Sequence, residues 1–159
     1  MLAGLLMSCG AIGIVDADEP SSDDSTKPVV MLRAELRMAQ NGGSNTFQYV
    51  PATVIKEGQE IDYTVRIVNP DTVAMPAAIV IQPLPTNTHY VAGSASGAGA
   101  DIQFSVDGGQ TFAKPGSLRS PASPERVANT TEYTHIRWQL RYPLAPKAVV
   151  LARFRAVFE

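Results

Sequence analysis

The sequence of 159 residues predicts an all-β fold, an antiparallel β-sandwich of about seven or eight strands. Three observations lead to this prediction. Apolar and polar residues alternate with a period of two in several segments, and clusters of glycine, proline, asparagine and aspartate separate these segments. No segment carries a convincing apolar stripe with the helical period of 3.6 residues. At this length the chain has room for one domain with its own apolar core.

Six segments are expected to form strands. In 30–38 the apolar side chains at the even positions, from Val30 to Met38, alternate with Met31, Arg33, Glu35 and Arg37. The other expected strands are 61–67, 73–81, 102–106, 136–141 and 150–158. Each alternating segment presents one apolar and one polar face, which is typical of antiparallel sheets covered on one side. The turns between them are expected at Asn41-Gly42-Gly43, Glu57-Gly58, Asn69-Pro70-Asp71, Asp107-Gly108-Gly109 and Ala145-Pro146.

The N-terminal residues 1–17 are expected to be an export signal. Met1 to Val15 are apolar or small and carry no charge, but a membrane span takes about 20 residues. Two forms of processing fit. Leu6-Met7-Ser8-Cys9-Gly10 resembles a bacterial lipobox, which would place a lipid on Cys9, whereas the small residues Val15 and Ala17 fit cleavage after Ala17. The third alternative is an ordinary N-terminal strand or helix that buries a free cysteine.

Residues 18–27 are expected to be an acidic, flexible linker, followed by the sandwich domain at 28–159. The linker has no large apolar side chain, so it cannot bury enough surface to offset its chain entropy. The whole chain holds 15 acidic and 13 basic residues, and five of the acids lie before Pro28. The domain itself is therefore close to neutral, and nucleic acid is not an expected partner. Cys9 is the only cysteine, so no disulfide is expected within the chain.

Several motifs resemble a bacterial conserved-repeat domain of unknown function. They are IKEGQEIDYTVRIVN at 55–69, AIVIQPLP at 78–85, THYVAGS at 88–94, IRWQL at 136–140 and PLAP at 143–146. The members of that family are immunoglobulin-like sandwiches in surface and secreted proteins, so the resemblance implies an Ig-like fold. The sequence departs from the family pattern at Gln82, where aspartate is usual, and at Lys147, where glycine is usual. Family members usually occur as arrays, whereas this chain holds one copy.

No catalytic, cofactor or metal site is expected. His89 and His135 are the only histidines, and neither stands in a metal-binding or nucleophile motif. The octapeptide from Ser105 to Phe112 has the pattern of an Asp-box hairpin, in which Asp107 accepts hydrogen bonds from turn amides and the glycines permit positive φ. A structural hairpin is therefore expected there. Trp138 is in phase with Ile136 and Leu140 and is expected in the core.

Four arginines form the candidate interaction face: Arg137, Arg141, Arg153 and Arg155. All four stand at polar positions of the last two expected strands. If these strands were neighbours, the arginines would share one face, which could bind an acidic partner. A solvated face with scattered acidic neighbours is the other interpretation.

These observations predict a non-catalytic interaction or structural module that is exported. It would be a periplasmic protein, a membrane-anchored lipoprotein or a secreted protein, and an envelope or surface protein would be its partner. Contact with a membrane is expected only through an N-terminal lipid anchor or signal. The alternative function is a glycan-binding or adhesion domain, which would use a loop end or the arginine face.

Overall fold

The computed structural model describes residues 27–39, 47–97 and 99–159. The prediction of an all-β protein is confirmed: the described residues form eleven strands in antiparallel sheets and two short 3-10 helices. The strands are β1 (Val29–Ala39), β2 (Phe47–Pro51), β3 (Glu60–Val68), β4 (Ile79–Pro83), β5 (Thr88–Tyr90), β6 (Ser96–Gly97), β7 (Ala100–Ser105), β8 (Arg119–Ser120), β9 (Ser123–Val127), β10 (His135–Leu140) and β11 (Val149–Phe158). The helices are η1 (Pro115–Ser117) and η2 (Thr130–Glu132).

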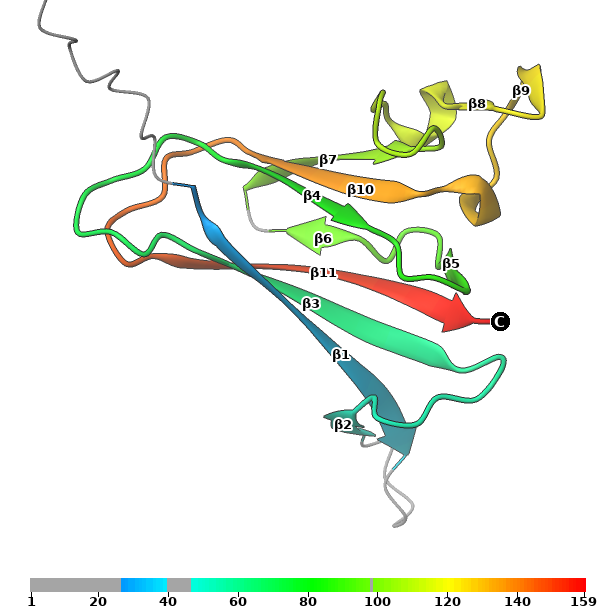
Figure 1. Ribbon diagram of the computed structural model, residues 1–159, viewed down its shortest axis with the longest axis horizontal. Coiled ribbons are helices and arrows are strands. Elements are labelled where there is room, and N and C mark those ends of the chain that lie inside the picture. Colours follow the sequence, from blue (N-terminus) through cyan, green and yellow to red (C-terminus); the bar gives the residue numbers. More distant parts are fainter. Residues whose placement is uncertain (1–26, 40–46, 98) are drawn as a thin grey trace, which may run out of the picture.

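Two sheets of unequal width face each other (Figure 1). The larger sheet has the order β2-β1-β3-β11-β5, with β6 also paired to β11, and the smaller sheet has the order β4-β10-β7. A two-stranded hairpin of β8 and β9 forms a third sheet. The outer face of each sheet is the face that points away from the other sheet.

The core lies between the two sheets and follows from the alternation in β3, β10 and β11. Along β3 the odd residues from Ile61 to Ile67 are buried, and their register partners on β11 include Ala152 and Phe154. Trp138 of β10 is fully buried, as its phase predicts, and its ring centroid lies 6.2 Å from that of Phe154. The indole N–H of Trp138 donates a hydrogen bond of 3.0 Å to the Ser96 carbonyl, so this ring is satisfied as well as packed.

The long strands lie where alternation predicts them, but other expectations differ from the structure. Only the end of the expected strand 73–81 belongs to β4, and Met75 makes a single bridge to Leu144 instead. The described residues form eleven strands rather than seven or eight, because five short strands were not expected. The first and last long strands, β1 and β11, both flank β3 in one sheet. In constant-type immunoglobulin domains the first and last strands lie in opposite sheets.

Candidate functional site

The four arginines of the expected interaction face do not share one face. Arg137 and Arg141 lie on β10, in the smaller sheet, whereas Arg153 and Arg155 lie on β11, in the larger sheet. The expectation of a single arginine face is therefore wrong, because the two last strands are not neighbours. The other candidate positions, Cys9 and Ala17, lie outside the described residues.

On the smaller sheet both arginines are engaged by neighbours in the same sheet. Arg141 forms an ion pair of 2.5 Å with Asp101, which lowers the pKa of Asp101 and raises that of Arg141. Arg137 donates to the side-chain oxygen of Gln103, and its guanidinium carbon lies 4.5 Å from the centre of the Phe112 ring. These contacts fit a solvated, internally paired surface.

On the larger sheet Arg153 and Arg155 belong to a belt of mixed charge on the outer face. The belt consists of Arg33, Glu35, Arg37, Glu60, Asp62, Arg153 and Arg155, which come from β1, β3 and β11. Arg155 pairs with Glu60 at 2.5 Å, and Arg33 pairs with Glu35 at 2.8 Å. Because three carboxylates lie among the four arginines, with Glu35 directly opposite Asp62, the belt offers no concentrated positive field.

Asp62 of β3 lies within this belt and is partly buried. Partial burial raises the pKa of Asp62, and the positive charge of Arg155 opposes this shift. A hollow of about 110 Å³ lies beside it, lined by Glu35, Tyr49, Thr64 and Arg153 among others. Tyr49 is 52% exposed, so one aromatic ring stands at the rim of a polar hollow.

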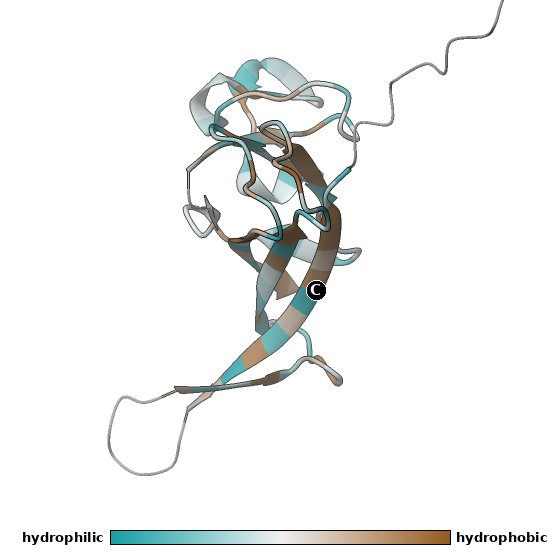
Figure 2. Ribbon diagram, turned by 90° about the vertical axis from the view of Figure 1, so that its left-hand side faces the viewer, coloured by the Kyte–Doolittle hydropathy of each residue, from teal (hydrophilic) through white to brown (hydrophobic). Residues whose placement is uncertain are grey.

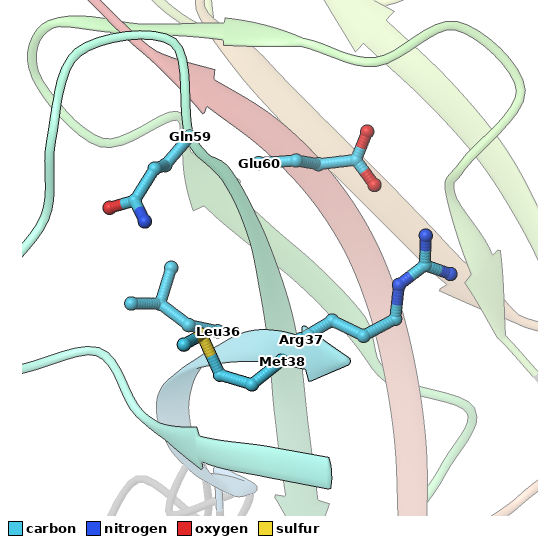
Figure 3. Close-up of a pocket in the computed structure, with 5 residues that line it drawn as sticks. All are labelled: Leu36, Arg37, Met38, Gln59 and Glu60. Atoms are coloured by element: carbon cyan, nitrogen blue, oxygen red, sulfur yellow. The ribbon is translucent and has the colours of Figure 1, made fainter. Parts of the chain in front are cut away.

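A second hollow, of about 210 Å³, lies where β1 meets the start of β3 (Figure 3). Arg37 and Glu60 extend to one side of it, whereas Leu36 and Met38 extend to the other. These side chains lie on opposite sides because successive residues of a strand point to opposite faces of the sheet. The hollow is an open corner of the sheet and brings no catalytic set together.

The most unusual surface is the N-terminal half of β1. On the side away from β3, β1 pairs with β2 only from Glu35 to Ala39. Within the described residues no strand pairs with Val29–Arg33 on that side. We call this segment the free edge of β1. A free edge presents unpaired N–H and C=O groups, and it is a ready place for another strand to pair.

The free edge is also apolar on both of its faces. Val29 and Met31 are each 45% exposed on the outer face, and Val30 and Leu32 are 41% and 42% exposed on the face toward the core. Figure 2 shows this stretch of β1, next to the grey N-terminal trace, as continuously hydrophobic, whereas the rest of the strand alternates. Val30, Leu32 and Met38 lie on the apolar face that the alternation predicts, but they are exposed. The opposing sheet has three strands among the described residues, and these three side chains remain exposed there.

The apolar surface of the free edge continues across the outer face of the larger sheet. One row of register partners runs from Val29 through Val68 to Val149, and the next runs from Met31 through Arg66 to Leu151. Val149 and Leu151 are 46% and 43% exposed. The first row is apolar throughout, whereas Arg66 interrupts the second. Exposed apolar side chains in a row are typical of surfaces that meet another molecule.

An aromatic groove lies at the opposite side of the sandwich, between β5, β7 and η2. Its floor is a cluster of three buried rings, Tyr90, Phe104 and Tyr133, with centroids 4.8 to 5.7 Å apart. The groove has a volume of about 290 Å³, and its walls include Pro115 and Ile102. The Tyr90 hydroxyl accepts a hydrogen bond from the Ala95 amide, and burial raises the pKa of Tyr133. The groove can therefore take an apolar side chain but offers few polar groups.

The Asp-box segment forms a tight turn whose polar groups are used within the turn itself. Asp107 accepts hydrogen bonds from the Ser105 hydroxyl at 2.6 Å and from the Thr111 hydroxyl at 2.6 Å. The amides of Gln110 and Thr111 also donate to it. These donors, led by Ser105, hold the pKa of Asp107 well below its usual range. Gly108 and Gly109 adopt φ of 75° and 88°, which explains the glycine pair.

A second satisfied carboxylate closes the β8–β9 hairpin against η2. Arg126 donates to Glu132 at 2.9 and 3.0 Å, and the buried Ser120 hydroxyl and the Asn129 amide donate as well. These contacts, with Arg126 the largest cause, lower the pKa of Glu132 to about 2. The carboxylate that accepts the Ser120 hydroxyl is also paired with Arg126, and its lowered pKa makes it a weak base toward the serine.

The histidines are held apart on different sheets. His89 of β5 contacts Glu159, and His135 of β10 contacts Thr134. Among residues 27–39, 47–97 and 99–159 no group of three metal-ligating side chains comes together. The described part of the chain also contains no helix with the length and apolar character that crossing a membrane requires.

Comparison of the chain with known protein families, with curated proteins and with solved structures gave no match.

Proposed function

We propose that the chain is a non-catalytic interaction or structural module of the cell envelope or of the secreted fraction. Its binding surface is the free edge of β1 with the apolar row from Val29 through Val68 to Val149 beside it, and its partner is a protein. The observation that carries this proposal is the free edge itself. Val29 to Leu32 expose apolar side chains on both faces of a strand that lacks a described partner on one side.

Export is supported by the N-terminal sequence. The apolar run before Asp16 fits the hydrophobic region of a signal peptide, and Cys9 or Ala17 would mark its processing. The acidic stretch that follows would separate the module from a membrane or a cleavage site. The expected compartments are the periplasm, the outside of the cell and, for a chain lipidated at Cys9, a membrane surface.

An Ig-like sandwich of the conserved-repeat family belongs to this proposal. Support comes from the motif residues. Gly58 lies in a turn at φ 79°, Asn69 is fully buried, and Trp138 lies at the centre of the core. Each of these residues has a conformational or packing reason to occupy its place in the motif. The position of β11 beside β3 would then be a variant of the usual strand order.

The alternative of a glycan-binding or adhesion domain is favoured by one observation, the exposed Tyr49 beside Asp62 and Arg153. Sugar rings stack on exposed aromatic faces, but Phe47, the other exposed aromatic of β2, is covered by the guanidinium of Arg37 at 4.4 Å. A single tyrosine gives a smaller surface than the free edge, so the protein-binding function is the stronger proposal.

The proposed function is tested by site-specific photo-crosslinking in the cells that produce the protein. Benzoylphenylalanine replaces Met31 in one variant and Ile79 in a control, because Ile79 is 54% exposed on β4, in the other sheet. We expect a discrete adduct from position 31, with an envelope or secreted protein or with a second copy. Position 79 should give none.

Three results would contradict the proposal. The first is the absence of an adduct at position 31 in variants that retain the circular dichroism spectrum of the unaltered protein. The second is the same set of adducts from both positions. The third is recovery of the protein from the cytoplasm.

A further inference from the structure

The free edge of β1 is complementary to itself. We propose that two copies of the chain pair their β1 strands antiparallel about a two-fold axis at Met31, so that the larger sheet continues from one copy into the other. This inference rests on the proposed function, because it names the partner of the same surface. The proposal also specifies the register of the pair, because the directions of the backbone hydrogen-bonding groups determine which residues face each other.

The direction of the backbone groups follows from one hydrogen bond at the end of the free edge. The Ala52 amide donates to the Ala34 carbonyl at 3.1 Å, so Ala34 turns its carbonyl away from β3. Backbone groups of successive residues point to opposite sides of a strand. Val30 and Leu32 therefore turn both N–H and C=O toward the free edge, whereas Met31 turns its groups toward β3.

Two neighbouring registers of a symmetric pair are disfavoured by the residues at their ends. A pair centred on Val30 would place Pro28 opposite Leu32, and Pro28 has no N–H to donate. A pair centred on Leu32 would place Val30 opposite Ala34, whose carbonyl already accepts the Ala52 amide. Centres between residues would set an outward-facing residue against an inward-facing one and would form no ladder.

The register centred on Met31 satisfies every group that faces the free edge. Val30 of each copy lies opposite Leu32 of the other, and each pair exchanges two hydrogen bonds. Val29 then lies opposite Arg33. Because the paired residues end at Arg33, the partner strand stops where Ala52 begins to occupy the edge.

The side chains are complementary in the same register. On the face toward the core, Val30 and Leu32 of the two copies would cover one another, and on the outer face the two Met31 side chains would meet at the axis. An isologous pair of this kind needs no second surface.

The paired segment is short, so the interface is small and the dimer is expected to be weak. Five residues of each copy take part, with apolar rows on either side of them. An interface this small is typical of transient association. We expect a concentration-dependent dimer with a dissociation constant on the order of 1–100 μM rather than an obligate one.

The register is tested by disulfide trapping in the full chain carrying Cys9→Ser. Directly opposite residues that do not exchange hydrogen bonds lie about 4.5 Å apart at Cα, which a disulfide can bridge. Met31→Cys should form a covalent dimer across the axis. A mixture of Val29→Cys and Arg33→Cys chains should give mainly the mixed dimer. Val54→Cys is the control, because Val54 is 74% exposed and lies outside the strand.

The interaction itself is tested by sedimentation equilibrium of the unaltered chain and of Leu32→Lys and Ile79→Lys. We expect Leu32→Lys to raise the dissociation constant about tenfold or more, which corresponds to about 1.4 kcal/mol, and Ile79→Lys to leave it unchanged. Trapping at Val54→Cys as efficient as at Met31→Cys, or an unaltered chain that stays monomeric to about 1 mM, far above the range set by the interface size, would overturn the dimer.

The failure of the dimer and the failure of the proposed function give different results. A monomeric purified chain that still gives an adduct with another protein from position 31 would overturn the dimer and keep the function. The absence of both the dimer and the adduct would overturn both.

Discussion

At the scale of single residues, the contact between Gly97 and Trp138 shows how tightly the two sheets are fitted. A Cβ atom added to Gly97 would lie 2.8 Å from Cδ1 and 3.3 Å from Nε1 of Trp138. The indole cannot move away freely, because it is fully buried and donates to the Ser96 carbonyl. Glycine is required here by the close approach of the Trp138 ring rather than by a left-handed backbone.

We therefore expect Gly97→Ala to lower the free energy of unfolding by about 1–3 kcal/mol through overpacking. Gly116→Ala is the matched control, because nothing lies within 4 Å of the Cβ position at Gly116 and its φ is not positive. Chemical denaturation of the three proteins measures the difference. Equal stability of Gly97→Ala and the unaltered protein would show that the two sheets are not in close contact at Trp138.

Residue types alone predicted the role of Trp138 but not the grouping of the arginines. The burial of Trp138 follows from its phase with Ile136 and Leu140, which is local information. Whether Arg137 and Arg153 share a face depends on which sheet each strand joins, and periodicity carries no signal for that. Arg141 and Arg155 likewise find their ion-pair partners, Asp101 and Glu60, 40 and 95 residues away in the sequence.

At the scale of elements, one buried amide ties two connections together. Asn69 follows β3, and its side-chain amide donates to the carbonyls of Val73, Leu144 and Ala145 at 2.8 to 3.1 Å. Its carbonyl accepts the Asp71 amide at 2.9 Å. The connection from β3 to β4 is thereby fastened to the connection from β10 to β11, and Asn69 is fully buried.

Replacing Asn69 should loosen both connections. We expect Asn69→Ala to cost about 2–4 kcal/mol, because buried carbonyl groups lose their donor. Gln82→Ala is the control, since the Gln82 amide makes a single exposed hydrogen bond to Pro83, and it should change stability by less than about 0.5 kcal/mol. Thermal or urea unfolding measures both. A decrease in the free energy of unfolding below about 1 kcal/mol for Asn69→Ala would mean that the Asn69 hydrogen bonds contribute little to stability.

The elements that alternation predicted are those with one covered face. β3, β10 and β11 keep strict alternation because their inner faces pack in the core. β2 and β9 were not predicted, because nearly all of their residues are exposed and burial therefore imposes no alternation of apolar and polar residues on them. β5, β6 and β8 are two or three residues long, which is too short for a period to show.

At the scale of the whole molecule, the unequal width of the two sheets creates the proposed binding surface. Three strands of the smaller sheet face a larger sheet to which six strands belong. The inner face of β1 therefore extends beyond the strands of the smaller sheet, and Val30, Leu32 and Met38 remain exposed. Alternation looks the same on a covered and an uncovered strand, so the sequence pattern predicted the strand and missed its exposure.

One sequence signal could have identified the free edge. Val29, Val30, Met31 and Leu32 are four consecutive apolar residues, so both faces of the strand are apolar there. In an antiparallel sheet covered on one side, such a run requires a partner for the second face. The register at Met31 could not be predicted from the sequence, because it depends on the hydrogen bond between Ala52 and Ala34.

The most direct test of the account is hydrogen exchange of the individual β1 amides, measured by NMR in dilute and in concentrated protein. In dilute protein Val30 and Leu32 should exchange quickly, whereas Met31 and Arg33, whose amides face β3, should be protected. In concentrated protein the Val30 and Leu32 amides should become protected as two free edges pair. Strong protection of Val30 and Leu32 at the lowest concentration would show that the edge is already covered within one molecule, and would contradict its role as a binding surface.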